Sequence, residues 1–230
     1  MKKNNPACDL QSCYLCARCL PEWRTVISSR KENRRFKKGA AIFREDEPVE
    51  GIFFVYSGKV KVHKRWGSEK ELIIRFAKTG DIIGYRGLGN DMVHPVSATA
   101  LEDVVVCFID LDFFETTLQV NHRLTYDLMR FYASELQEAE RRMRNLVHME
   151  VKGRIAETLL MLQECFGTNR QGFIDITLTK QDMASYAGTT YETFSRVTSE
   201  LVNEKMIKVS GKNIAILKEK KLIGLTQFSG

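Results

Sequence analysis

The hydrophobic pattern of the chain changes its period close to residue 112, and this change restricts the fold more than any other feature. From about Phe36 to Asp110, short apolar runs alternate with polar residues and are separated by glycine-containing turns. Such runs, at strand-length intervals, predict a small antiparallel β-barrel or jelly roll. From about Phe114 to Leu146 there is neither glycine nor proline, and apolar residues recur every three or four positions. That spacing predicts one long helix with an apolar seam.

Composition sets the broad class of protein. The chain has 230 residues, of which 43% are hydrophobic and 28% are charged, as in an ordinary soluble globular protein. No apolar run approaches the roughly 18 to 20 residues of a membrane span, and the N-terminus lacks the apolar core of a signal peptide. We therefore expect a cytoplasmic protein without a membrane partner. The net charge of +6 permits an anionic partner but does not identify one.

The later part of the long helix carries the spacing of a coiled coil. Its apolar residues step by three or four positions, and they are Leu136, Ala139, Met143 and Leu146. This interval favours self-association, so these residues are candidates for a dimer interface. The alternative is a helix that packs against its own β-barrel, and spacing alone leaves both open.

The segment after the long helix has the pattern of a winged helix-turn-helix. A helix is expected from Val151 to Phe166, followed by a short strand from Gly172 to Leu178. Thr179 with Asp182, and Thr189 with Glu192, have the spacing of two helix-capping boxes, and Gly188 lies between them. Two short apolar runs then predict a two-stranded wing, at 206–209 and 213–217. Apolar residues expected between the two helices are Met183, Ala187, Phe194 and Val197.

One face of the second helix in this motif is suited to reading bases. Glu192, Ser195 and Arg196 are spaced by three and four residues, so they share that face. Arginine can bind guanine O6 and N7 together, and a carboxylate can accept from cytosine N4. Thr190 and Tyr191 begin the same helix, while Lys180 and Lys212 suit phosphates. The alternative is a solvated Glu–Arg pair of the kind common on helices.

Four of the six cysteines are crowded near the N-terminus, at Cys8, Cys13, Cys16 and Cys19. Gaps of two and four residues are typical of iron–sulfur ligation and suit zinc equally well. Cys107 and Cys165 stand alone, and each can be a small buried hydrophobe. No set of side chains has the pattern of a catalytic site, so we do not expect an enzyme.

These features predict four segments in an α+β chain. They are a cysteine-rich segment (1–35), an antiparallel β-barrel or jelly roll (36–112), a long dimerisation helix (113–148) and a winged helix-turn-helix (149–230). The order of parts over essentially the whole chain resembles the CRP/FNR superfamily of bacterial transcription regulators. The segments KKGAAIF, GIFFVYSGKVKV and GDIIGYRGLG are similar to turns of its cyclic-nucleotide-binding fold, and TTYETFSR is similar to the recognition segment of the FNR (fumarate and nitrate reduction) branch.

The resemblance carries expectations about partners and cofactors. It implies a homodimer on palindromic double-stranded DNA, with Glu192, Ser195 and Arg196 reading a TTGAT-like half-site, and RNA polymerase as a further partner. In the FNR branch, three N-terminal cysteines and one barrel cysteine hold a [4Fe-4S] cluster. By that resemblance Cys13, Cys16, Cys19 and Cys107 are the ligands, Cys107 because ALEDVVVCFIDLDFFETTL matches the corresponding segment. One N-terminal gap is shorter here than in that branch, and Cys8 could replace Cys107.

The resemblance also allows cyclic nucleotide as the ligand, but the sequence departs from that pattern. Members that bind cyclic AMP have a glutamate after the GDIIG-like turn and an arginine before the strand that leads to residues 100–102. Here Tyr85 and Arg86 follow the turn, and Pro95-Val96 stand where the arginine pair is expected. Without an arginine to neutralise the phosphodiester, cyclic nucleotide is disfavoured.

The sequence therefore predicts a DNA-binding regulator that senses oxygen or redox state through an iron–sulfur cluster. Two alternatives remain open: the same regulator with a structural zinc or thiol switch, and a cyclic-nucleotide-binding signalling module.

Overall fold

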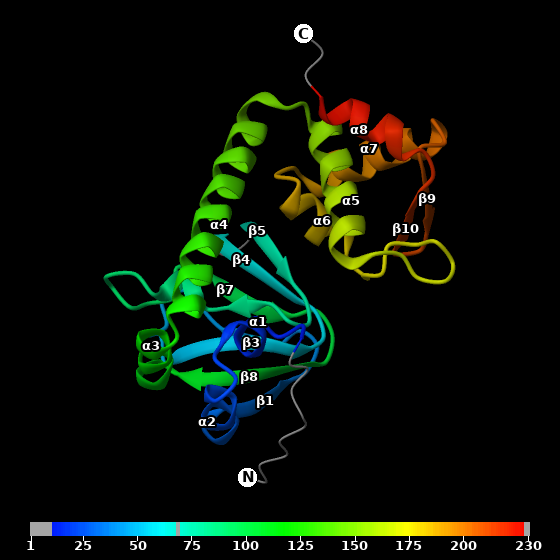
Figure 1. Ribbon diagram of the computed structural model, residues 1–230. Coiled ribbons are helices and arrows are strands. Elements are labelled where there is room, and N and C mark those ends of the chain that lie inside the picture. The colour runs from blue at the N-terminus through cyan, green and yellow to red at the C-terminus, as the bar shows by residue number, and fades with distance from the viewer. Residues whose placement is uncertain (1–10, 68–69, 228–230) are drawn as a thin grey trace. The chain divides into compact units, whose positions relative to one another are not determined.

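The computed structural model describes residues 11–67 and 70–227, and Figure 1 shows their arrangement. The chain divides into two compact units, the first ending at Glu135 and the second beginning at Leu136. The division falls inside one long helix, so that helix contributes residues 122–135 to the first unit and residues 136–148 to the second.

The first unit combines short helices with strands. Its helices are α1 (Tyr14–Arg18), α2 (Trp23–Arg30), the 3₁₀ turn η1 (Tyr85–Gly87), α3 (Leu111–Val120) and the beginning of α4 (His122–His148). Its strands are β1 (Glu32–Phe36), β2 (Ala41–Phe43), β3 (Gly51–Ser57), β4 (Val60–Trp66), β5 (Lys70–Ala77), β6 (Ile82–Ile83), β7 (Ser97–Ala100) and β8 (Val104–Asp110).

The strands form two four-stranded antiparallel sheets, in the orders β1-β8-β3-β6 and β2-β7-β4-β5. Side chains alternate across a strand, so β3 directs Phe53 and Val55 to one core and Ile52 and Phe54 to another. The first core draws its residues from both sheets. The second lies between the β1-β8-β3-β6 sheet and the helices α1 to α4, and Figure 1 shows α1 and α2 lying over that sheet. The predicted jelly roll is confirmed, as two packed sheets rather than a closed barrel.

The seven apolar runs that predict strands all form strands, and their ends shift by at most three residues. The predicted runs are 41–43, 51–56, 59–63, 71–76, 82–84, 96–100 and 104–109. Strand β1 was not expected, because its sequence Glu-Asn-Arg-Arg-Phe has no apolar alternation. It pairs with β8 at the edge of the sheet, and the Arg34 guanidinium lies 3.4 Å from the centre of the Phe108 ring. A cation–π contact thus takes the place of the apolar side chain that a strand pattern would show.

The prediction of one uninterrupted helix from Phe114 to Leu146 is wrong at Asn121, where α3 ends and α4 begins. Asn121 is 1% exposed, and its side chain accepts from the Leu20 backbone N–H and donates to the Thr117 carbonyl, each at 2.8 Å. The break is stabilised by an asparagine that bonds a distant segment. A search for glycine and proline could not find it.

The second unit contains the rest of α4 and the elements after it. These are α5 (Val151–Phe166), α6 (Lys180–Tyr186), α7 (Tyr191–Asn203), β9 (Ile207–Ser210), β10 (Asn213–Ile216) and α8 (Glu219–Thr226). The predicted bounds of α5 are confirmed. Strand β9 is shifted by one residue from its prediction, and β10 ends one residue earlier than predicted. The strand expected at 172–178 is wrong. That segment makes only an isolated bridge between Thr168 and Ile174, because its backbone bonds to the Ile214 carbonyl instead of extending a ladder.

Candidate functional site

Helices α6 and α7 form the predicted helix-turn-helix. Thr179 caps α6, and its side chain and that of Asp182 make the two reciprocal bonds of a capping box. Gly188 has φ +63°, the left-handed conformation that glycine adopts without strain. The second cap differs from the prediction: Thr190, not Thr189, accepts from the Thr193 N–H. The turn is therefore one residue longer than the capping pattern suggested.

Helix α7 buries one face and exposes the other. Phe194 and Val197, predicted to pack between the helices, are 0% and 3% exposed. Glu192 and Arg196 are exposed and Ser195 is half-buried, so the predicted reading face points away from the core. Among the described residues, Arg196 forms its ion pair with Glu200, at 2.5 Å, and not with Glu192. The carboxylate that holds Arg196 is therefore that of Glu200, one turn after it, and not that of Glu192, one turn before it.

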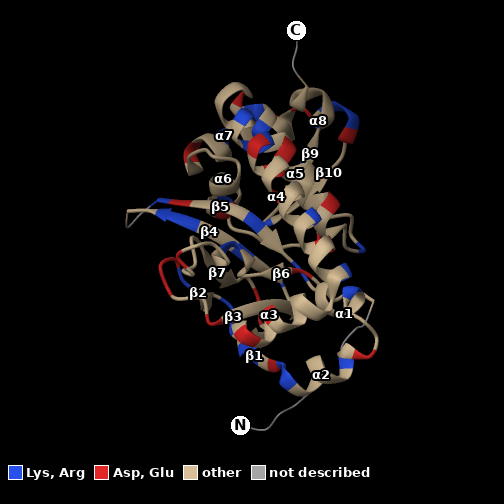
Figure 2. Ribbon diagram, turned by 60° about the vertical axis from the view of Figure 1, so that its left-hand side comes forward, with Lys and Arg blue, Asp and Glu red and all other residues tan. Residues whose placement is uncertain are grey.

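The residues expected to contact phosphate lie close to this face. Lys180 Nζ donates to Ser195 Oγ at 3.1 Å. Lys180, Tyr191 and Lys212 all line one cavity of about 260 Å³ between α6, α7 and the wing. Lysine and arginine also lie on β1 and on the end of β4, where Figure 2 shows blue segments. The distribution of basic residues therefore does not single out one surface as the candidate for DNA binding.

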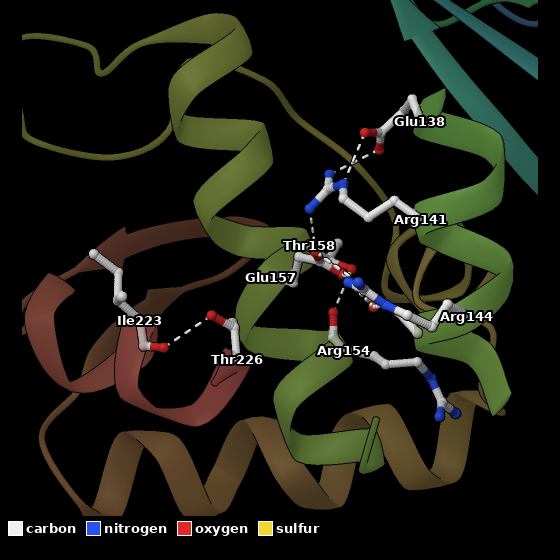
Figure 3. Close-up of polar contacts among 9 residues, drawn as sticks. Glu138, Arg141, Arg144, Arg154, Glu157, Thr158, Ile223 and Thr226 are labelled. Atoms are coloured by element: carbon white, nitrogen blue, oxygen red, sulfur yellow. Dashed lines mark hydrogen bonds and ion pairs between the residues drawn. The ribbon is translucent and has the colours of Figure 1, made fainter. Parts of the chain in front are cut away.

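The last part of α4 is tied to α5 by charged side chains, which the sequence did not single out. Arg141 bonds Glu138 on its own helix and Glu157 on α5, at 2.8 and 2.6 Å (Figure 3). Glu157 also accepts two bonds from Asn145, which is 3% exposed. The sequence offers no signal for this contact, because the burial of Asn145 depends on where α5 packs.

The apolar seam of α4 has two environments. Leu124 and Leu128 are 1% and 5% exposed in the second core of the first unit. The four residues proposed for dimerisation, Leu136, Ala139, Met143 and Leu146, are all exposed, Leu136 and Met143 by 61% and 64%. The two alternatives left open by the spacing therefore apply to different halves of the helix: the first half packs on its own sheet, and the second leaves its seam uncovered in the single chain.

Three of the cysteines lie on and beside α1. Cys13 precedes the helix, Cys16 is inside it and Cys19 follows it. Cys16 and Cys19 are buried and Cys13 is half-buried. Burial raises the pKa of the Cys19 thiol, although Arg24 acts in the opposite direction, so this thiol stays protonated at neutral pH in the described structure.

Cys107 lies on β8 and belongs to the same core as Cys19. Its Sγ donates to Asn33 Oδ1 on β1 at 3.3 Å. Cys165 is half-buried on α5, in the other unit, and Cys8 lies outside the described residues. Four thiols of the predicted cluster site thus lie in the first unit. They are Cys13, Cys16 and Cys19, which are within seven residues of each other, and Cys107.

The donor chemistry suits a metal or cluster, since thiolates are the ligands of iron–sulfur centres and of structural zinc. In the described part of the chain, no three cysteine, histidine or carboxylate side chains are arranged as ligands of one metal ion. The fold brings Cys19 and Cys107 into one core, with Cys13 packed against it, and the described geometry is that of packed thiols.

The region that resembles a cyclic-nucleotide pocket is filled by side chains. His94 is 3% exposed and stacks on Phe43, with ring centres 4.1 Å apart. The cavity left between these rings, Tyr85 and Arg86 has a volume of about 10 Å³, roughly that of one water molecule. A nucleotide cannot enter this cavity unless the rings move.

Tyr85 and Arg86, which take the place of nucleotide ligands, are engaged with α4. The Tyr85 hydroxyl donates to Glu135, and Arg86 Nη2 lies 2.6 Å from the same carboxylate. Tyr132 Oη donates to the Tyr85 carbonyl at 2.6 Å. Burial raises the pKa of Tyr85 to about 12, and Glu135 acts in the same direction against Arg75 and Arg86. The turn after β6 is therefore bonded directly to the long helix.

None of the helices in residues 11–67 and 70–227 is both long enough and apolar enough to cross a bilayer.

Two family models match the chain. Residues 33–121 match the cyclic nucleotide-binding domain, and residues 153–225 match the Crp-like helix-turn-helix domain. The transcriptional activator protein Anr of Pseudomonas aeruginosa is 29% identical, over 96% of this chain and 93% of its own length. The CRP-like cAMP-activated global transcriptional regulator of Mycobacterium tuberculosis is 26% identical, over 81% of this chain and 84% of its own.

The structure of FixK2 from Bradyrhizobium japonicum superposes with a TM-score of 0.77 at 25% identity, covering 87% of this chain and 99% of that chain. These similar proteins are transcription regulators and not enzymes, and the helix-turn-helix places DNA binding in the second unit. The chain belongs to the CRP/FNR superfamily of bacterial transcription regulators.

Proposed function

We propose that the protein acts as a homodimer that reads a palindromic DNA site and responds to oxygen or redox state through its N-terminal cysteines. The observation that carries the sensing part is the packing of the cysteine helix on α4. The Tyr14 and Phe131 ring centres are 5.4 Å apart, and Arg18 lies 3.8 Å from Asp127. A change at Cys13, Cys16 or Cys19 therefore acts on side chains that contact the long helix directly.

The observation that supports a dimer is the uncovered seam of Leu136, Ala139, Met143 and Leu146. Apolar side chains at coiled-coil spacing are stabilised when a second helix covers them. Two recognition helices related by a dyad would then read two half-sites about one helical turn apart. RNA polymerase is the further partner that membership of this superfamily suggests.

Sequence reading is assigned to Glu192, Ser195 and Arg196 on the outer face of α7. We expect Arg196→Ala to cost roughly 1 to 3 kcal/mol on a TTGAT-like palindrome and to relax the preference at the guanine that it contacts. Lys212→Ala should weaken binding to all sequences alike. Binding titrations against single-base variants of the site distinguish the two. An intact guanine preference in Arg196→Ala would remove this residue from the reading face.

The cofactor in this proposal is a [4Fe-4S] cluster, with Cys13, Cys16, Cys19 and Cys107 as its ligands and Cys8 as the alternative fourth, and the resemblance to the FNR branch supports it over zinc. When bound, such a cluster supplies sensitivity to oxygen. The chain's own contribution is to place buried thiols in the layer that packs on α4. Cys19 would bind the metal as a thiolate. Because the pKa of this thiol is raised, its proton would be lost as the metal binds.

Anaerobic purification followed by iron, sulfide and zinc analysis tests this assignment. We expect brown protein with a broad absorption near about 400 nm that air bleaches. Cys107→Ser and Cys8→Ser, made separately, identify the fourth ligand by loss of the colour. Colourless anaerobic protein holding about one zinc per chain would replace the cluster by a structural zinc site. Colourless protein without metal would leave a thiol switch.

Cyclic nucleotide is the competing ligand, and the filled cavity beside His94 argues against it. We expect no binding of cyclic AMP by calorimetry. Saturable binding that the variant Arg86→Met abolishes would instead identify the protein as a cyclic-nucleotide-binding module.

A further inference from the structure

The carboxyl end of α6, the first helix of the helix-turn-helix, is held by arginines from two other helices. Arg142 on α4 donates from Nη2 to the Tyr186 carbonyl at 3.0 Å. Arg154 on α5 donates from Nε to the Ala187 carbonyl at 3.0 Å and from Nη2 to the Gly188 carbonyl at 3.2 Å. The last carbonyls of a helix have no partner within the helix, so two guanidinium groups satisfy three successive acceptors.

Both arginines also have a second anchor. Arg154 Nη1 donates to the Met149 carbonyl at 2.7 Å, in the link between α4 and α5. The Arg142 guanidinium stacks on the Tyr186 ring, 4.1 Å from its centre. Arg154 is half-buried, where charge-assisted hydrogen bonds are less exposed to competing water. Each arginine therefore joins the α6–α7 turn to an element outside the motif.

The turn also contacts α4 through an apolar side chain. A Cβ built on Gly188 would lie 2.2 Å from Leu146 Cδ2, so glycine is required there for packing as well as for its positive φ. Arg142 directly precedes Met143 of the proposed dimer seam. The end of α4 that would pack on its twin is thus the end that holds the DNA-reading motif.

We propose that Arg142 and Arg154 are positioning residues for DNA recognition, which fix the α6–α7 turn to the end of α4 and thereby set the separation of the two recognition helices in the dimer. The proposal rests on the dimeric, palindrome-reading function proposed above. Neither arginine is on the reading face of α7. Their effect is on which spacing between half-sites the dimer accepts, rather than on which bases it reads.

Arg154 donates to the carbonyls of Ala187 and Gly188 at once, and this requires the planar fork of a guanidinium. A lysine at this position keeps the charge but presents a single ammonium group, which cannot match two carbonyls with the same fixed geometry. Arg154→Lys should therefore recover part of the DNA affinity and spacer preference that Arg154→Met loses.

The matched control is Arg141, which lies on α4 beside Arg142 and carries the same charge. Its guanidinium bonds Glu138 and Glu157 (Figure 3), on α4 and α5, and not the carbonyls at the end of α6. Arg141→Met, Arg142→Met and Arg154→Met each remove one positive charge. A general loss of electrostatic attraction for DNA should consequently be equal in the three variants.

The experiment measures binding of the full-length protein to palindromes with TTGAT-like half-sites, using the best spacer and spacers one base pair longer and shorter. At the best spacer, Arg154→Met and Arg142→Met should bind roughly 10- to 100-fold more weakly, the factor expected for lost hydrogen bonds to a charged group. Their preference among the three spacers should flatten. Arg141→Met should keep the wild-type preference.

A measurement without DNA tests the arginine cap of α6, which consists of the bonds from Arg142 and Arg154 to the carbonyls of residues 186–188. Amide hydrogen exchange across residues 184–194 should be faster in Arg154→Met than in the wild type or Arg141→Met, while sedimentation shows an unchanged dimer. If a methionine variant does not fold, Arg154→Lys supplies the same comparison. The proposal is overturned if folded cap variants keep the wild-type spacer preference and exchange rates, or if Arg141→Met shows the same losses. A wild type that prefers no palindrome would refute the dimeric function instead, and exchange alone would then decide the cap.

Discussion

The two halves of helix α4 carry one hydrophobic pattern and meet opposite environments. In residues 122–135 the seam is buried in the second core, with Leu124 and Leu128 almost inaccessible. In residues 136–148 the seam continues at the same interval, and Leu136 and Met143 are exposed by more than half. An apolar periodicity therefore shows that a helix face needs a partner without showing which one. The first half serves the stability of the fold, and we assign the second to assembly.

The largest expected effect is a charge placed in the buried half. Leu128→Glu puts a carboxylate where the side chain is 5% exposed, and the first unit should lose about 4 kcal/mol or more of unfolding free energy. Both tryptophans, Trp23 and Trp66, lie in this unit, so urea unfolding followed by tryptophan fluorescence reports on it. Met129→Glu, at a neighbouring side chain that is 60% exposed, is the control and should unfold like the wild type. Equal stability of the two variants would show that burial of Leu128 does not stabilise the first unit.

A charge in the exposed half should leave folding intact and abolish assembly. Met143→Glu should give monomers in sedimentation velocity and weaken palindrome binding by about 100-fold or more, because the second half-site no longer adds its contacts. The tryptophan unfolding curve should not move. A variant that remains dimeric would place the interface elsewhere and leave the exposed seam unexplained.

Glu135 lies at the junction, and its carboxylate joins the first half of α4 to Tyr85 and Arg86. Glu135→Gln keeps the size of the side chain and removes its charge, leaving Arg86 and the nearby Arg75 opposite a neutral amide. We expect the first unit to lose about 2 kcal/mol, as for hydrogen bonds to charged groups. Gln137→Glu changes the charge two residues away on an exposed position and serves as the control. No difference between these variants would mean that the junction is held by packing alone.

The smallest effect is a pH dependence of the same junction. The pKa of Tyr85 is raised to about 12 from an ordinary value of 10, so the unfolded chain loses this proton first as the pH rises. The stability that the neutral phenol provides is complete below pH 10 and is lost as the pH approaches 12. The wild type should lose about 1 to 2 kcal/mol more than Tyr85→Phe over this range. Parallel stability curves for the two proteins would contradict a bond that depends on the phenol.

Sequence periodicity predicted the elements whose physical cause is local. Capping by Thr179 and Asp182, the glycine turn at Gly188 and the alternation of β3 are each set by a few neighbouring residues. What it missed depends on distant partners. Asn121 breaks the long helix because its side chain bonds Leu20, and β1 is a strand because it pairs with β8.

The candidate site shows the same division. The outward face of α7 follows from helix geometry, so Glu192 and Arg196 could be placed from spacing alone. Arg196 nevertheless pairs with Glu200, one turn after it on α7, and the spacing alone did not decide between Glu192 and Glu200. Arginines from α4 and α5 cap α6, and this arrangement depends on where those helices pack. The cysteines were found by spacing, whereas the burial of Cys107 and Cys19 in one core depends on the whole first unit.

The layer of α1 and α2 over the β1-β8-β3-β6 sheet has a consequence for engineering. This N-terminal segment buries Ile52, Phe54 and Ile109 and supplies the Leu20 N–H that Asn121 accepts. A variant that lacks residues 1–30 would expose one apolar face of this sheet to water. We expect it to aggregate instead of giving a soluble DNA-binding protein. The N-terminal segment, to which we assign sensing by proposal, is therefore not a removable module, and grafting it onto another regulator would require a recipient sheet with a matching apolar face.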